Sequence, residues 1–576
     1  MAILISNKNF KNSKKIGSYY LNSNFKIILD RYYYISIGEV YNYTFEEVVF
    51  LLINKNEKKF NSINGEFALI VYDSLLDNVF FLNDKTGREI VYYHVSSQSF
   101  SMSNDFWSII CHENKTIKDI NTLELKTHLF FSSSVTYQTI INNINIFENG
   151  IYAVYHNRVL EKKKYWLFKQ KENNLTKSEK FDMIDKKLFE CFNTIKKINS
   201  KDTIYGVGIS GGMDSRIIPY YALKTGMKIK SFIVGEEKPH FLLKSNDHTS
   251  SDRIVKHFEL EHTKLEYNEL SYEEKNLLDC LYNPIGPSQL FKIPNINKLN
   301  FDVLLTGASG FIVGSSPFYT KNRYKNLIEI LFVQQSDLKL KTNFYRIKKA
   351  LNYIFGTKFK LEIIPNELKG VITHKEIEQI KQEQIKYLNS LSNLSKTEQL
   401  MNYAIGVLGQ KNKSGAFESL LNHKKSYTPY IPFLLDIVST WSDDDLYDRK
   451  LFEDFIKVRL PELSSIRQQS HKPSIDIKNP NIFHKLYSLF VYVIRGQGVM
   501  NYNNWAKQRE FKKFVNEELN KYNYIGKYIN IDYIKKLVYK NKLNADVLAN
   551  CIKLNRILYM IDTKRDKHGI CKDIKK

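Results

Sequence analysis

The sequence has few cysteines and no long apolar run. Five cysteines occur in 576 residues, and none of them is spaced like a zinc ligand set or a CxxC redox pair. A disulfide-stapled fold is therefore not expected, and so sparse a cysteine content is typical of a reducing cytoplasm. No uncharged apolar run reaches the roughly 18–20 residues that a membrane helix needs, and the amino terminus turns polar too early for a signal peptide. We expect a cytoplasmic protein with no membrane partner.

Proline and glycine are also scarce, at 12 and 24 residues, which argues against long flexible tracts. The apolar content of 43% and charged content of 25% are ordinary for a globular protein and exclude a mainly disordered or collagen-like chain. Positive charge is in excess, since 85 Lys and Arg against 61 Asp and Glu give a net charge of +24. The basic residues are spread along the chain rather than gathered in one block. This favours solvated faces over a nucleic-acid partner.

Two patterns divide the chain. From residue 25 to about 166, short β-rich runs alternate with turn signals, and helical stretches interrupt at 44–54 and 122–131. This predicts an α+β domain of sheets covered by helices. From residue 178 onward, strands are expected at 203–209, 228–234 and 303–305 and helices at 178–198, 216–225 and 249–259. Such alternation predicts a parallel α/β sheet, followed by a mainly helical part beyond residue 321.

The strongest local signal is the segment that joins the strand at 203–209 to the next helix. It carries Ser210, Gly211, Gly212, Asp214 and Ser215. Glycines allow the backbone to approach a phosphate closely, and the first N–H groups of a helix then point at the anion. Asp214 beside a polyphosphate is explained if it holds Mg²⁺. The alternative is an ordinary strand–turn–helix with an Asp/Ser cap.

This loop resembles the SGGxDS signature of the ATP pyrophosphatase superfamily, whose members split ATP between its α and β phosphates. Other segments resemble those of glutamine-hydrolysing asparagine synthetases, in the same order and at similar spacing from about residue 30 to 475: residues 38–42 (GEVYN), 64–68 (NGEFA), 83–89 (NDKTGRE), 231–235 (SFIVG) and 431–436 (IPFLLD). The resemblance implies an α+β Ntn-hydrolase-like sandwich of the class II glutamine amidotransferase type over residues 1–170. It also implies an α/β ATP pyrophosphatase domain, of the adenine nucleotide alpha hydrolase type, with a helical carboxy-terminal part over residues 178–576.

The resemblance also implies roles for particular residues. It assigns ATP binding to Ser210, Gly211, Gly212, Asp214, Ser215, Val234, Thr306 and Gly307, with Mg²⁺ on Asp214. Asn64, Gly65 and Glu66 match positions that bind glutamine. A cation that steadies the α-phosphate aligns with Arg449, and the adjacent Lys450 is the closer chemical match.

The chain departs from the family at decisive positions. Ala2 stands where the family has its cysteine nucleophile, so no glutaminase activity is expected, and we favour a structural turn for Asn64 and Gly65. Ala308, Phe311 and Ile312 replace acidic residues near the second metal carboxylate, although Asp247 could compensate. Thr428 lies where the family has an acidic residue of its acceptor pocket, which puts an aspartate substrate in doubt.

We therefore predict an asparagine synthase-like ligase that uses ATP and Mg²⁺. It would adenylate a small-molecule, peptide or sugar carboxylate and couple it to ammonia or an amine. The alternative is a catalytically silent nucleotide-binding scaffold, and an RNA-modifying pyrophosphatase is a weaker third hypothesis. Because members of the family commonly form dimers, the resemblance leaves a homodimer open.

Overall fold

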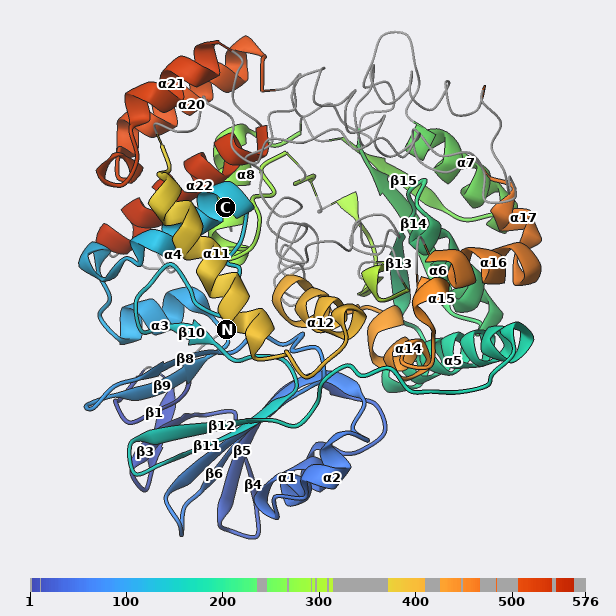
Figure 1. The fold of residues 1–576 in the computed structure, drawn as a ribbon, viewed down its shortest axis with the longest axis horizontal. Helices are drawn as coiled ribbons and strands as arrows, with labels where there is room; N and C mark the ends of the chain where they lie inside the picture. The colour runs from blue at the N-terminus through green and yellow to red at the C-terminus, as the bar shows by residue number, and fades with distance from the viewer. Residues whose placement is uncertain are drawn as a thin grey trace.

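Two antiparallel sheets form the amino-terminal part of the protein (Figure 1). The computed structural model describes residues 3–10, 12–235, 246–266, 269–291, 293–295, 298–307, 310–313, 371–409, 425–446, 449–466, 483, 506–540 and 545–563. The first sheet has the order β10-β8-β9-β1-β3-β2, with β1 Ile3–Ser6, β2 Ser13–Ile16, β3 Tyr19–Asn22, β8 Tyr92–Val95, β9 Phe100–Ser103 and β10 Asn145–Ile146. The second has the order β12-β11-β7-β6-β5-β4, with β4 Lys26–Ile28, β5 Tyr32–Val40, β6 Gly65–Asp73, β7 Asn78–Asn83, β11 Ile151–His156 and β12 Val159–Lys164.

Helices cover the outer faces of these two sheets. The sheets enclose a core that includes Ile5, Ile70, Phe81 and Phe100. Outside the second sheet lie α1 (Phe45–Ile53), which begins with a Thr44 capping box, and α2 (Glu57–Phe60). Beside the first sheet lie α3 (Phe106–His112) and α4 (Thr122–Phe131). The sheets covered by helices were predicted, but β1, β2 and β3 precede the region that was expected to form sheet.

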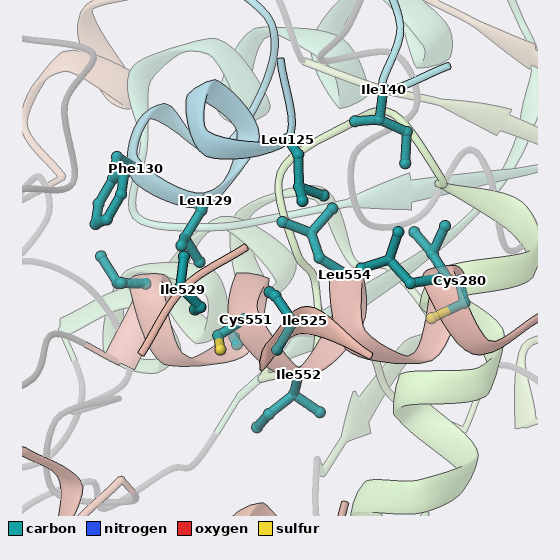
Figure 2. Close-up of a cluster of buried hydrophobic side chains, with 14 of the residues drawn as sticks. Leu125, Leu129, Phe130, Ile140, Cys280, Ile525, Ile529, Cys551, Ile552 and Leu554 are labelled. Carbon is teal, nitrogen blue, oxygen red and sulfur yellow. The ribbon is translucent and has the colours of Figure 1, made fainter. Parts of the chain in front are cut away.

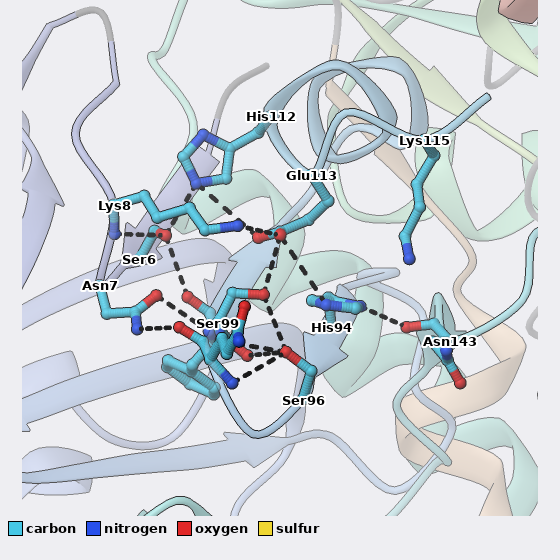
Figure 3. Close-up of polar contacts among 12 residues, drawn as sticks. Ser6, Asn7, Lys8, His94, Ser96, Ser99, His112, Glu113, Lys115 and Asn143 are labelled. Atoms are coloured by element: carbon cyan, nitrogen blue, oxygen red, sulfur yellow. Dashed lines mark hydrogen bonds and ion pairs between the residues drawn. The ribbon is translucent and has the colours of Figure 1, made fainter. Parts of the chain in front are cut away.

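A buried polar cluster fastens α3 to the first sheet (Figure 3). Glu113 accepts hydrogen bonds from Lys8 Nζ at 2.8 Å and Ser99 Oγ at 3.0 Å. His94 Nε2 lies 3.8 Å from the same carboxylate. Burial lowers the pKa values of His94 and His112 below the ordinary range. The cluster ties the carboxy-terminal end of α3 to β1, β8 and β9 and is explained by this structural role.

A parallel sheet forms the centre of the second part of the chain. Its order is β15-β14-β13-β16-β17, and every neighbouring pair is parallel. The strands are β13 Ile204–Gly208, β14 Lys228–Val234, β15 His262–Leu265, β16 Val303–Leu305 and β17 Lys425–Tyr427. Helix α5 Lys177–Ile198 precedes the first of these strands, and the connecting helices include α6 Met213–Lys224 and α7 Asn246–Phe258. The parallel α/β sheet was predicted, but its two edge strands, β15 and β17, were not expected from the sequence.

Helices dominate the described chain beyond residue 370. They are α11 His374–Asn389, α12 Lys396–Tyr403, a π-helix at Ala404–Gly409, α14 Tyr430–Val438, α15 Asp443–Leu446, α16 Lys450–Arg459, α17 Pro461–Ser464, α20 Arg509–Tyr522, α21 Ile531–Tyr539 and α22 Ala545–Asp562. In the described part of the chain, no helix combines the length and the apolar content needed to cross a membrane.

Helix α22 joins the end of the described chain to the amino-terminal part (Figure 2). It packs against α4, α20 and α8 (Tyr272–Tyr282), and its side chains are buried on nearly every side. Leu125 and Leu129 of α4 share one core with Ile552 and Leu554 of α22. Trp107 of α3 also donates a hydrogen bond from Nε1 to the Cys280 carbonyl of α8 at 3.1 Å. The two halves of the chain are therefore joined by a common hydrophobic core.

Candidate nucleotide-binding site

The glycine-serine loop lies at the carboxyl end of β13, the central strand of the parallel sheet. The chain continues to β14 on one side of β13, and β16 lies on the other, so the loop occupies a topological switch point, where open α/β sheets bind ligands. Gly212 is the N-cap of α6 and, having no side chain, makes no side-chain cap. The amides of the first turn of α6 are therefore suited to an anion.

Two serine hydroxyls close the loop on itself. Ser210 Oγ and Ser215 Oγ lie 3.1 Å apart, and Ser215 Oγ donates to the Ser210 carbonyl at 3.1 Å. The Gly212 amide donates to Ser210 Oγ, also at 3.1 Å. The bend is thus formed by the protein alone, which lowers the cost of ordering it around a ligand.

Gly307, which follows β16, lies directly against the first turn of α6. A Cβ placed on Gly307 would stand 3.2 Å from the Asp214 carbonyl carbon and 3.2 Å from the Ser215 nitrogen. The preceding Thr306 donates its amide to the Tyr427 carbonyl of β17 at 3.1 Å. The structure therefore brings Thr306 and Gly307 together with the loop. Val234 ends β14 at the same edge of the sheet, half-buried.

Arg216 is a structural partner of the loop that sequence reasoning missed. Its side chain is fully buried and donates to the carbonyls of Gly211 at 3.0 Å and Gly212 at 3.3 Å. It also donates to the carbonyls of Leu463 at 2.8 Å and Ile466 at 2.9 Å. These contacts fix the loop to the region that follows α16. The only signal in the sequence was that Arg216 directly follows the motif, and this position did not indicate that the side chain would be buried.

The two candidate cations are placed very differently. Arg449 precedes α16 in the left-handed region, with φ of 60°, and is buried, whereas Lys450 is exposed. The Arg449 guanidinium forms an ion pair with the Asp214 carboxylate, with Nη1 3.3 Å from Oδ2 and Nη2 in contact with Oδ1. Tyr430, which sequence reasoning did not single out, donates its hydroxyl to the Asp214 carbonyl at 2.7 Å. Of the two cations, Arg449 is the one beside the loop.

This arrangement does not fit a magnesium ion on Asp214. Mg²⁺ binds carboxylate oxygens and retains waters around them, but here both Asp214 oxygens face the Arg449 guanidinium. Among the residues that the structure describes, no group of three or more His, Cys, Asp or Glu side chains could hold a metal. Ile312 is fully buried and apolar. Ala2, Ala308 and the side chains of Asp247 and Phe311 lie outside the described part.

The three positions that match glutamine-binding residues lie at the junction of the two halves. The Asn64 side-chain oxygen accepts from Lys85 Nζ at 3.3 Å. A Cβ on Gly65 would stand 2.4 Å from the Glu39 carbonyl, so the close pairing of β5 and β6 requires glycine there. Glu66 is buried, and its Oε1 accepts the amide of Thr428 at 3.3 Å.

Arg88 completes this junction and was also missed from the sequence. It is fully buried and donates from Nη2 to Thr428 Oγ1 at 2.5 Å. Its Nε lies 3.9 Å from Glu66 Oε2. Thr428 stands between β17 and α14, two residues before Tyr430, so the junction is connected to the loop. In this structure Glu66 is therefore engaged by Thr428 and Arg88 at the junction.

The comparisons with known proteins bear on the amino-terminal part. Residues 42–166 match the family model of the glutamine amidotransferase domain. This part of the chain is therefore amidotransferase-like. The matched segment contains Asn64, Glu66 and Arg88 and ends before the glycine-serine loop. No match was found among curated protein sequences.

Distant likenesses to solved structures were also found. Glutamine phosphoribosylpyrophosphate amidotransferase from B. subtilis, complexed with ADP and GMP, is 9% identical with a TM-score of 0.17, over 38% of this chain and 50% of that one. NMN synthetase from Francisella tularensis is 12% identical with a TM-score of 0.15, over 48% of this chain and 97% of that one. At these values neither structure adds detail to the site.

Proposed function

We propose that the chain is an ATP-dependent, AMP- and pyrophosphate-forming amide ligase of the asparagine synthetase type. It adenylates a carboxylate and couples the acyl group to ammonia or an amine. The observation that carries the proposal is the bend at residues 210–215, formed at the switch point of a parallel sheet with Gly307 against it. The amidotransferase-like segment at residues 42–166 supports a reaction in which an amide is formed.

The chain's own residues give each step a physical basis. The first-turn amides of α6 and the Ser210 hydroxyl hold phosphate oxygens, Ser215 fixes the bend through its bond to the Ser210 carbonyl, and the Arg449 guanidinium stabilises charge that develops on the α-phosphate. A carboxylate oxygen attacks the α-phosphorus, the bond to the β-phosphate oxygen breaks, and pyrophosphate leaves. The amine nitrogen then attacks the acyl carbon, loses a proton, and AMP leaves with the electron pair of the broken bond.

The amine comes from solution or from the substrate in this proposal. Ala2 offers a methyl group where a thiol nucleophile would be needed. Glu66 and Arg88 are engaged with Thr428 at the junction. Incubation of the purified chain with glutamine should therefore release no glutamate, and sustained release would contradict this part of the proposal.

The test of the ligase is formation of AMP. The purified chain is incubated with ATP and a panel of small-molecule, sugar-acid and peptide carboxylates, and AMP is separated by chromatography. A carboxylate that supports adenylation should also support exchange of labelled pyrophosphate into ATP. Ser210→Ala should lower that exchange, because it removes a hydroxyl of the loop, whereas Ser200→Ala, on an exposed serine before β13, should not.

A second candidate is a nucleotide-binding scaffold without catalysis. The observation that favours it is the ion pair of Asp214 with Arg449, together with the loss of acidic residues at Ala308 and Phe311. ATP binding with no AMP formed from any carboxylate would favour the scaffold. AMP formation that depends on a carboxylate would exclude it.

A further inference from the structure

We propose that Arg449 takes the place of a metal ion in this site, so that the loop binds a nucleoside polyphosphate without magnesium on Asp214. The inference rests on the proposed function, because it concerns how the same loop holds ATP. Under it Asp214 is a positioning residue that orients the guanidinium. Arg449 is then the residue that contacts phosphate.

The first observation is the place of the guanidinium. Arg449 is 8% exposed and pairs with Asp214, the second residue of α6. The first turn of a helix is also where its amides favour an anion. The cation and these amides therefore converge on one place. A metal ion would carry its positive charge to the same place.

The second observation is an unused donor on the same side chain. The Arg449 Nε is buried and has no hydrogen-bond partner among the described residues. A guanidinium carries five N–H donors in a planar fork that matches the oxygens of a phosphate. Two of its nitrogens face Asp214, so Nε and the remaining Nη hydrogens are the donors left for a ligand. A buried donor without a partner is costly, and a phosphate oxygen would satisfy it.

The third observation is the shortage of metal ligands. Asp214 is engaged by the guanidinium, and positions 308, 311 and 312 carry alanine, phenylalanine and isoleucine. A lone carboxylate already neutralised by arginine has little attraction left for a divalent cation. The positive charge that a polyphosphate needs is then supplied by Arg449 and by the helix terminus.

Charge also sets the expected effect of changing Asp214. The carboxylate and the phosphate compete for the same guanidinium, and they repel each other. Asp214→Asn keeps a side-chain oxygen that can hold the guanidinium in place and removes the negative charge. Binding of phosphate should become tighter. A metal ligand would give the opposite result, because its loss weakens metal-dependent binding.

The experiment is calorimetric titration of the full chain with ATP, once in excess EDTA and once in excess Mg²⁺. The wild type should bind with affinities that agree within about threefold in the two buffers. In EDTA, Arg449→Met should weaken binding by about 10- to 100-fold, the range for loss of a charge-assisted hydrogen bond. Arg449→Lys should recover part of that loss, and Asp214→Asn should tighten binding.

Arg459→Met provides the matched control. Arg459 ends α16 and forms an ion pair with Asp182 of α5, but this pair is solvent-exposed. The variant removes the same kind of group from the opposite end of α16 and should leave ATP affinity unchanged. Circular dichroism and thermal unfolding of each variant show whether it is folded. The comparison of EDTA with Mg²⁺ needs no variant, so the test does not depend on their folding.

Each outcome decides the proposal. Binding in EDTA that depends on Arg449 supports it. Binding that requires Mg²⁺ and is abolished by Asp214→Asn overturns the inference and leaves the proposed ligase standing. No binding in either buffer overturns the proposed function, and the inference with it.

Discussion

The buried pair of Arg88 and Glu66 provides the sharpest test of how the two halves are joined. The perturbation is Arg88→Met, which keeps most of the apolar stem and removes the guanidinium. The side chains of Arg88 and Glu66 are only 2% and 4% exposed, so the remaining carboxylate cannot be solvated without opening the junction. The Thr428 hydroxyl also loses its 2.5 Å contact.

The expected loss of folding free energy follows from this burial. Removing one partner of a buried ion pair typically costs about 3–5 kcal/mol, because the other charge is left uncompensated. Glu66→Gln/Arg88→Met removes both charges, so its cost should be smaller than the sum of the single costs by about 0.5–3 kcal/mol. In contrast, Lys163→Met breaks the exposed pair with Glu57 and should cost less than about 1 kcal/mol.

The assay is urea denaturation followed by tryptophan fluorescence, with the free energy taken from the first transition, since a chain of this size need not unfold in two states. Trp441 lies in the hydrophobic core that contains Tyr427 and Tyr430, and Trp166 packs against the same core, so both serve as reporters. A cost below about 1 kcal/mol for Arg88→Met would refute the reasoning, as would strict additivity in the double variant.

Three further predictions follow from close contacts and from burial. Gly307→Ala should weaken ATP binding, because its Cβ would stand 3.2 Å from backbone atoms of α6. Calorimetry measures the affinity, and an unchanged value would show that Gly307 and α6 can move apart freely. Gly406→Ala should lower the melting temperature, because its Cβ would stand 2.4 Å from Asn149 Oδ1 and 2.4 Å from the Tyr137 hydroxyl; an unchanged melting temperature would contradict this close packing. Burial lowers the pKa of His262 from 6.5 to about 4, so the folded protein prefers the neutral imidazole and loses stability as the pH falls from 6.5 through 4. In His262→Gln this component of the acid sensitivity should disappear, and an unchanged pH profile would contradict the assignment.

The sequence predicted the features that local pattern controls. The strands at 228–234 and 303–305 and the helix at 122–131 lie at the predicted residues, and the helix at 44–54 within one residue of each end. The loop at 210–215 was found because glycines and hydroxyls between a strand and a helix form a local signal. Secondary-structure periodicity and turn chemistry act over a few residues, so they can be recognised in one sequence.

The remaining features depend on residues far apart in the chain. Chemical similarity favoured Lys450, but Lys450 is exposed at the start of α16, and it is Arg449, in the left-handed region just before it, that is buried against Asp214. Nothing in the sequence around Arg88 predicted its contact with Thr428, which lies 340 residues later. Such pairings arise when separate elements pack together, and no local pattern encodes them.

The packing of α22 on α4 has a consequence for synthesis on the ribosome. The apolar face of α4 is made early, but its covering helix starts 414 residues after α4 ends, from Phe131 to Ala545. At about 5–20 residues per second, the nascent amino-terminal domain waits about 20–80 s with that face uncovered. During this interval the growing polypeptide exposes a hydrophobic surface to which chaperones and neighbouring chains can bind.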